Sequence, residues 1–176
     1  RPYSEVKALM ALLQRYLVEE EDEILSNAIR FRAMGHLDRL PPHVRDPLLA
    51  LTEKSNTGET QMDLCLALSY GGRAELVDAT KAIAAKVAQG ELALSAIDEA
   101  LISAHLYAPD LPEPDLLIRT SGEMRLSNFM LWQLAYAEIV VTDTLWPDFR
   151  KPALMQAFAT YAGRERRFGK TSAQLG

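Results

Sequence analysis

Arginines and hydroxyls gather in one short polar stretch of the sequence, residues 119–128. Arg119 and Arg125 lie six residues apart across a turn that contains glycine, and Ser127 and Asn128 follow directly. A guanidinium group is a planar fork of donors that binds phosphate oxygens in pairs, and a hydroxyl adds a further donor. The first N–H groups of a helix starting after Asn128 would add to these donors, because helix N-termini bind anions. The stretch therefore predicts a diphosphate site.

The spacing of these residues leaves a second interpretation open. Glu123 and Asp115 are close enough in sequence to bind the same arginines in ordinary surface salt bridges. Such exposed pairs contribute little. The neighbouring sequence is compatible with a site, because residues 114–119 are typical of a buried strand, and functional side chains of α/β proteins collect on the loops that follow such elements.

A longer string of residues favours the site. Residues 114–149, PDLLIRTSGEMRLSNFMLWQLAYAEIVVTDTLWPDF, resemble the signature of the cis-prenyltransferases, the family of undecaprenyl diphosphate synthase. The resemblance extends in weaker form to Arg1-Pro2, to residues 70–73 (YGGR) and to residues 164–169 (RERRFG). It covers nearly the whole chain, and strings of this length seldom arise by chance.

The resemblance implies an enzyme that lengthens a prenyl chain. An allylic diphosphate, here expected to be farnesyl diphosphate, loses diphosphate, isopentenyl diphosphate attacks the developing cation, and loss of a proton leaves a cis double bond. The expected product is a long-chain polyprenyl diphosphate such as undecaprenyl diphosphate, a cell-wall lipid carrier. The resemblance also implies a cytoplasmic homodimer that contacts a membrane surface transiently when product is released.

Carried over residue by residue, the resemblance assigns substrate binding to six residues: Arg1, Arg119, Arg125, Leu126, Ser127 and Arg167. Arg167 belongs to Arg167-Phe168-Gly169, which resembles the R-x-G ending with which some relatives reach into a neighbouring subunit's site. A solvated helix end, whose arginines complement the helix dipole, explains the same charges equally well.

Glu138 is the metal ligand that the resemblance implies, holding Mg²⁺ together with an aspartate of a glycine-rich upstream loop. Glu138 lies between an apolar stretch and β-branched residues, where a carboxylate is costly unless a cation or metal ion binds it. This position indicates a bound partner without reference to the resemblance. The alternative partner is one of the signature arginines. The family aspartate is absent from this sequence, so the catalytic residue is unknown. Met124 stands where relatives carry histidine, which leaves that position without an assigned role.

Composition narrows the class of protein. The 176 residues, 48% hydrophobic and 24% charged, predict one soluble domain over residues 1–176 with a substantial core. A net charge of −5 argues against nucleic acid as a partner. The single cysteine, Cys65, excludes a disulfide framework and is expected to be a buried thiol, and the three histidines show no metal-site spacing.

Hydrophobic periodicity predicts alternating helices and strands. We expect helices over residues 3–22, 41–55, 74–88, 95–105, 129–137 and 152–166, and strands over residues 28–34, 61–69, 114–119 and 139–141. The helix over 95–105 should be capped by Ser95, and that over 129–137 should be buried on all sides. The alternation implies a three-layer α/β domain with a mostly parallel central sheet flanked by helices.

Residues 70–73 follow a predicted strand, at the end where ligands of open α/β sheets bind. Arg73 is therefore a candidate ligand, although a glycine pair between a strand and a helix is also ordinary turn chemistry. The family resemblance further implies two amino-terminal strands that this chain lacks, in the middle of the sheet.

Two alternatives to the enzyme stay open. The first is a non-catalytic subunit of a heteromeric cis-prenyltransferase, which would also lack the aspartate. The second, a generic diphosphate- or nucleotide-binding module, is disfavoured because neither G-x-x-x-x-G-K-[ST] nor G-x-G-x-x-G occurs.

Overall fold

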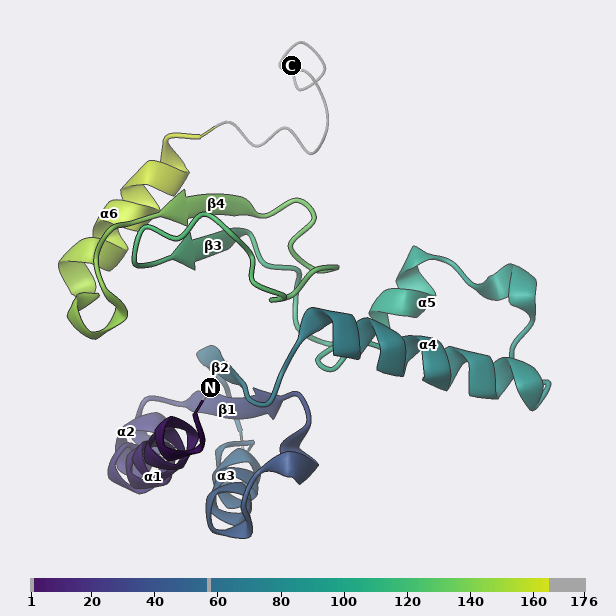
Figure 1. Ribbon diagram of the computed structural model, residues 1–176, viewed down its shortest axis with the longest axis horizontal. Coiled ribbons are helices and arrows are strands. Elements are labelled where there is room, and N and C mark those ends of the chain that lie inside the picture. The colour runs from purple at the N-terminus through teal and green to yellow at the C-terminus, as the bar shows by residue number, and fades with distance from the viewer. Residues whose placement is uncertain (1, 57, 165–176) are drawn as a thin grey trace. The chain divides into compact units, whose positions relative to one another are not determined.

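The computed structural model describes residues 2–56 and 58–164, which form two compact units divided between Tyr70 and Gly71 (Figure 1). Each unit is an α/β arrangement that contains one parallel pair of strands with helices packed around it. The predicted α/β class and the parallel pairing are confirmed. That residues 1–176 behave as a single domain stays a prediction.

The described residues of the first unit form two strands and three α-helices. Its elements are α1 (Tyr3–Glu19), α2 (Glu21–Ser26), β1 (Ile29–Met34), the 3₁₀ helix η1 (Leu37–Arg39), α3 (Pro42–Ser55) and β2 (Met62–Ala67). β1 and β2 pair in parallel from Ile29 beside Met62 to Met34 beside Ala67. The predicted helix over 3–22 ends at Glu19, where Glu20 departs from helical geometry, and a second short helix follows.

All three α-helices of this unit share one core with β1, and Figure 1 shows them grouped on one side of the two strands. Leu48 and Leu51 of α3, Phe31 of β1, Leu17 of α1 and Ile24 of α2 are buried in it. Burying side chains of this size removes apolar surface from water, which is the main stabilising term in a fold. This core accounts for the buried apolar residues of the three helices, whereas Val6 and Leu9 of α1 are exposed.

Arginines on the wetter face of β1 bind the neighbouring strand. Arg30 lies beside Asp63 in the register, and its Nη2 donates to Asp63 Oδ2 at 2.9 Å while its Nε donates to Oδ1. Opposite charges directly across a strand pair stabilise it. The strand predicted over residues 28–34 is confirmed as β1, and Cys65 of β2, expected to be buried, is half-buried.

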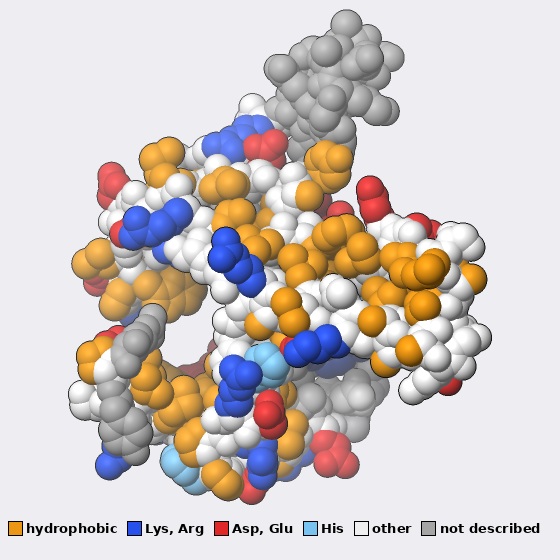
Figure 2. Space-filling model, turned by 45° about the vertical axis from the view of Figure 1, so that its right-hand side comes forward, with side chains coloured by type: hydrophobic (Ala, Val, Ile, Leu, Met, Phe, Trp, Pro, Cys, Tyr) orange, Lys and Arg blue, Asp and Glu red, His pale blue; other side chains and the backbone are white. Residues whose placement is uncertain are grey.

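The second unit contains the polar stretch of interest. Its elements are α4 (Gly72–Ala88), η2 (Leu94–Ala96), α5 (Glu99–Ser103), β3 (Leu116–Arg119), β4 (Glu138–Val141), η3 (Trp146–Asp148) and α6 (Lys151–Ala162). β3 and β4 pair in parallel, from Leu116 beside Glu138 to Arg119 beside Val141. Figure 2 shows hydrophobic side chains on the surface of this unit. Val77 of α4 and Leu94 and Ile97, which precede α5, are exposed.

The helix predicted over 95–105 is wrong in its start. A 3₁₀ turn covers Leu94–Ala96, the next residues are extended, and α5 begins only after Asp98. The Asp98 carboxylate accepts the N–H of Leu101 at 2.8 Å, so Asp98 rather than Ser95 is the N-cap. Aspartate is a strong N-cap residue because its oxygen satisfies a donor that has no partner within the helix.

The buried helix predicted over residues 129–137 is also wrong, because this segment is a series of turns. Asn128 and Met130 have positive φ values of 65° and 45°, which an α-helix cannot contain. Trp132 Nε1 donates to Ser103 Oγ at 2.9 Å and Gln133 Nε2 donates to Glu75 Oε1 at 3.1 Å. Contacts with α4 and α5 therefore override the helical pattern of the sequence.

No helix in the part of the chain that the structure describes is long and apolar enough to cross a membrane.

Ser55 generates a prediction about the stability of the first unit. Its hydroxyl is buried at the end of α3 and accepts the N–H of Phe31 in β1 at 2.9 Å. Ser55→Ala leaves that buried donor without a partner, so we expect the free energy of unfolding to fall by about 1–3 kcal/mol. Chemical denaturation measures it. Ser26→Ala, which removes an exposed hydroxyl from α2, is the control and should change stability by less than about 0.5 kcal/mol; equal losses in the two variants would contradict the prediction.

Candidate functional site

β3 ends at Arg119 and opens into a loop that is held against the chain beyond β4. Ser121 N–H donates to Thr144 O at 3.0 Å, and Gly122 N–H donates to Thr142 O at 2.9 Å. A Cβ added to Gly122 would lie 2.9 Å from Asp143 Oδ1, and φ there is +66°, so this tight turn favours glycine. The loop is therefore fixed at its start by the strand pair.

A pocket of about 250 Å³ lies between this loop and the two strands. Its lining is apolar along most of the strands and mixed, with charged and apolar side chains, from the end of β3 through the loop. The lining residues are Leu117, Ile139 and Val141 from the strands and Arg119, Glu123, Met124, Arg125 and Leu126 from the loop side. Such a pocket fits a ligand that is apolar at one end and anionic at the other. The structure thus brings Arg119, Arg125 and Leu126 together, as the sequence predicted.

Arg119 has a buried donor without a protein partner. Its Nε is buried and forms no hydrogen bond with any described residue, while its Nη2 lies 3.5 Å from Ser127 Oγ at the limit of a hydrogen bond. The described part of the chain offers Arg119 no ion pair, so the surface salt-bridge interpretation does not apply to it. A buried unsatisfied donor costs free energy, and a bound anion would remove that cost.

Arg125 is in a different state, for which the salt-bridge interpretation holds. Its guanidinium pairs with the carboxylate of Glu123, and 69% of its side chain is exposed. Exposed pairs of this kind are weak, so an anion of higher charge can take the place of Glu123. Ser127, exposed with φ of 51°, completes the group of candidate ligands in this loop.

Glu138 is held by an arginine that the sequence did not predict. Its Oε2 lies 2.8 Å from Nη1 of Arg164, just after α6, and the same Nη1 donates to Ile139 O. The alternative of a salt bridge is correct in kind, but its partner is not one of the signature arginines. Glu138 is half-buried, with 27% of its side chain exposed, which explains why a carboxylate at this position has a cationic partner.

The described residues alone do not form a metal site. Among them no group of three or more His, Cys, Asp or Glu side chains could hold a metal ion. The parallel register also places Glu138 beside Leu116, at the opposite end of the strand pair from Arg119. At ~3.3 Å per residue the two ends are about 10 Å apart. A magnesium role for Glu138 stays a prediction.

Two of the predicted ligands, Arg1 and Arg167, lie outside the described residues. The remaining candidate, Arg73, is exposed in the first turn of α4. The N–H groups at this helix start are occupied: Gly72 N–H donates to Asn128 O at 2.7 Å, and Arg73 N–H donates to Asn128 Oδ1 at 2.8 Å. Asn128 therefore caps α4 instead of starting the helix expected after it.

Sequence reasoning missed Glu75, the most deeply buried charged residue named among the core residues. It is 1% exposed, and its Oε1 accepts from Tyr107 N–H at 3.0 Å and from Gln133 Nε2 at 3.1 Å. The carboxylate thus ties α4 to two loops that lie far away in the sequence. In the sequence it looks like an ordinary acid in the first turn of a helix, and no local pattern distinguishes it.

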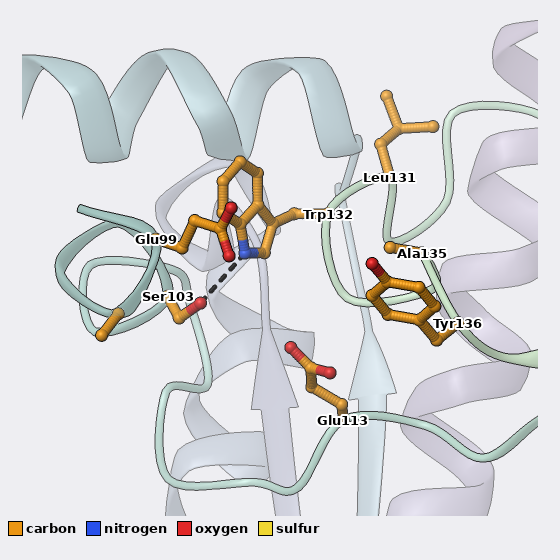
Figure 3. Close-up of a pocket in the computed structure, with 8 residues that line it drawn as sticks. Glu99, Ser103, Glu113, Leu131, Trp132, Ala135 and Tyr136 are labelled. Carbon is orange, nitrogen blue, oxygen red and sulfur yellow. Dashed lines mark hydrogen bonds between the residues drawn. The ribbon is translucent and has the colours of Figure 1, made fainter. Parts of the chain in front are cut away.

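A second cavity, of about 440 Å³, was not predicted either (Figure 3). The indole of Trp132 and the hydroxyl of Ser103 meet there in a 2.9 Å hydrogen bond, and the carboxylates of Glu99 and Glu113 line the same space. It differs from the first pocket in having no basic residue in its lining.

The pocket, its arginines and the fold can be set against known proteins. A family model described as "Putative undecaprenyl diphosphate synthase" matches residues 1–169. The chain belongs to this family. The cis-prenyltransferase resemblance of the sequence is confirmed, and with it the prediction of a prenyl-transferring enzyme family.

Curated relatives of the family are similar over almost all of this chain. An isoprenyl transferase of Geobacter sulfurreducens is 47% identical over 99% of the chain and 71% of its own length. The ditrans,polycis-undecaprenyl-diphosphate synthase ((2E,6E)-farnesyl-diphosphate specific) of Xanthomonas axonopodis pv. citri is 47% identical over 99% of the chain and 68% of its length. An isoprenyl transferase of Heliobacterium mobile is 49% identical over 96% of the chain and 65% of its own length. The chain thus spans about two thirds of the length of these relatives.

Solved structures of the family share the fold. Lavandulyl diphosphate synthase from Lavandula x intermedia, in complex with dimethylallyl diphosphate, superposes with a TM-score of 0.93 at 39% identity, covering 97% of this chain and 73% of that one. A probable undecaprenyl diphosphate synthase from Campylobacter jejuni superposes with a TM-score of 0.81 at 36% identity, covering 97% of this chain and 77% of that one. The fold predicted for a cis-prenyltransferase is therefore confirmed.

Proposed function

We propose that the protein elongates prenyl chains in the cis configuration, condensing isopentenyl diphosphate onto an allylic diphosphate. Farnesyl diphosphate is the proposed primer, and a long-chain polyprenyl diphosphate such as undecaprenyl diphosphate is the proposed product. Membership of the family supports the reaction, and the name of the Xanthomonas relative supports the primer and the product.

The observation that carries the proposal is the buried, unpartnered Nε of Arg119 in a pocket that apolar strand residues line together with Glu123 and Arg125. Isopentenyl diphosphate has the matching halves, a charged diphosphate and a five-carbon alkene. Its phosphate oxygens would accept from Arg119, and its hydrocarbon would lie against Leu117, Ile139 and Val141. A carboxylate ligand would offer fewer acceptors at fixed spacing to the two guanidinium groups.

Arg119, Arg125 and Ser127 act as the clamp for the diphosphate of isopentenyl diphosphate. Arg125 exchanges its exposed pair with Glu123 for the more highly charged ligand. Holding the alkene in line with the allylic carbon turns a bimolecular step into an effectively unimolecular one. The new carbon–carbon bond forms as the allylic carbon–oxygen bond breaks, diphosphate leaves with the electron pair, and a proton is lost from the added unit.

Mg²⁺, when bound, stabilises the charge of the departing diphosphate. Glu138 is the proposed contribution of this chain to that ion, shared with a carboxylate from elsewhere in the protein. Arg164 opposes this role, because it already neutralises the Glu138 carboxylate. The two arrangements compete for one side chain.

A cytoplasmic homodimer, a trans role for Arg167 at the neighbouring subunit's site and a transient contact with a membrane surface also stay predictions. Arg167 lies outside the described residues. Sedimentation of the full-length protein checks the dimer, which a purely monomeric mass would rule out.

The function is tested by incubating the full-length protein with farnesyl diphosphate, labelled isopentenyl diphosphate and Mg²⁺, and sizing the products. We expect label in a polyprenyl series many units long. Label incorporated only after a second protein of the family is added would instead support the non-catalytic subunit. No incorporation under either condition, with no measurable binding of isopentenyl diphosphate, would overturn the proposal.

The arginine clamp predicts a binding defect. Arg119→Ala and Arg125→Ala each remove one charge-assisted contact, which costs roughly 1.5–3 kcal/mol, so we expect the KM for isopentenyl diphosphate to rise about tenfold or more. The fold, checked by circular dichroism, should not change. Arg45→Ala is the matched control, because this exposed arginine pairs only with its neighbour Asp46 in the described contacts and belongs to the first unit. Unchanged kinetics in both clamp variants would refute the assignment.

The competition for Glu138 predicts two opposite shifts in magnesium dependence. Glu138→Gln keeps the volume and removes the charge, so the Mg²⁺ concentration for half-maximal activity should rise about tenfold, as for loss of one charge-assisted contact. Arg164→Gln frees the carboxylate, so that concentration should fall. Glu53→Gln, at an exposed site on α3, should leave it unchanged. If the wild type and the three variants give the same magnesium titration, Glu138 does not bind Mg²⁺ and serves only in the ion pair with Arg164.

A further inference from the structure

Asn128 satisfies two donors at the start of α4. Its carbonyl oxygen accepts the N–H of Gly72 at 2.7 Å, and its side-chain Oδ1 accepts the N–H of Arg73 at 2.8 Å. The first N–H groups of a helix have no partner within it, and a side chain at the N-cap position usually supplies one. Here the N-cap is Gly71, which has no side chain. The cap comes instead from a residue 55 positions later in the chain.

The same residue shapes the loop that carries Ser127. Ser127 and Asn128 both have positive φ, 51° and 65°, a backbone conformation that costs free energy for residues other than glycine and that asparagine tolerates best. Surrounding contacts must maintain such a conformation. The two hydrogen bonds to α4 do so, and they leave the Ser127 hydroxyl 3.5 Å from Nη2 of Arg119.

The two glycines at the start of α4 are explained by the close approach of this loop. A Cβ on Gly71 would lie 2.8 Å from Asn128 Nδ2, and a Cβ on Gly72 would lie 2.9 Å from Leu131 Cγ and 3.1 Å from Leu131 N. Gly71 has extended backbone, φ −162° and ψ 127°, which any residue can adopt. Lack of space beside the Asn128 amide, and not backbone conformation, therefore favours glycine at position 71. The YGGR motif forms a notch that receives the loop.

We propose that Asn128 is the positioning residue of the diphosphate clamp, docking the Ser127 loop onto the notch at the start of α4 so that the Ser127 hydroxyl stays beside Arg119. The proposal rests on the proposed function, since it assigns Asn128 to the isopentenyl diphosphate site. It also gives the YGGR motif a role that needs no direct contact between its glycines and a ligand. Asn128 itself touches no reacting atom.

Two different substitutions disturb this docking. Asn128→Gly removes the side-chain cap but keeps a residue that adopts positive φ freely, so backbone strain is not added. Gly71→Ala leaves Asn128 in place and pushes its amide group away from α4. In the full-length protein we expect each to raise the KM for isopentenyl diphosphate about tenfold, the effect of one lost hydrogen bond on binding. The KM for the allylic diphosphate should change much less.

The double variant separates positioning from general damage. Once Asn128 is glycine, the atom that a Cβ at position 71 would meet is absent, so Gly71→Ala should add little to the KM of Asn128→Gly. Asp98→Ala is the matched control, because it removes the N-cap of α5 in the same unit. It should lower the melting temperature and leave the KM for isopentenyl diphosphate unchanged. Hydrogen exchange of the Arg73 amide should quicken in the Asn128 and Gly71 variants and not in the control.

The outcomes that overturn the proposal are distinct from failure of the proposed function. If Arg119→Ala raises the KM for isopentenyl diphosphate while Asn128→Gly and Gly71→Ala do not, the clamp stands and the positioning role is wrong. Fully additive effects in the double variant would also refute it. If Arg119→Ala has no effect on the KM, the proposed site fails, and the positioning role fails with it.

Discussion

Parallel pairing of β3 with β4 is the constraint on which the candidate site depends. Because the strands run in the same direction, their carboxyl ends meet, and the loops that leave them lie together. Arg119 is the last residue of β3, and hydrogen bonds from Ser121 and Gly122 to the chain beyond β4 fix the start of its loop. The pocket with its apolar walls exists because this pair presents Leu117, Ile139 and Val141 on one face.

The two arginines of the pocket are prepared for an anion in different ways. Arg119 keeps a buried donor unsatisfied, which is a cost borne by the protein before any ligand arrives and recovered when one binds. Arg125 is satisfied by Glu123 on the surface and must change partners. The fixed donor of Arg119 would orient a bound anion. Arg125 would add positive charge, and Glu123 neutralises that charge while no anion is bound. In the proposed clamp, this combination would distinguish a highly charged diphosphate from a single carboxylate better than two fixed arginines would.

The sequence predicted most elements because their patterns are local. β1 lies within its predicted range, and α3, which begins at a proline and ends near asparagine and glycine, lies close to its predicted range. The segment over residues 129–137 was missed because its geometry depends on partners far away in the sequence, Ser103 and Glu75 among them. The Arg164 partner of Glu138 was missed for the same reason. The site arginines were found through the family string, since spacing alone left the salt bridges open.

The notch at the start of α4 also links positions that can change only together. Any side chain at position 72 must find room against Leu131, and any at position 71 must displace the amide of Asn128. We therefore expect substitutions at these glycines to be tolerated best where the facing residue is smaller. Across homologous sequences, residues 71 and 128 should therefore vary together, and so should residues 72 and 131. Such covariation would reflect the close approach of two segments that are distant in the sequence.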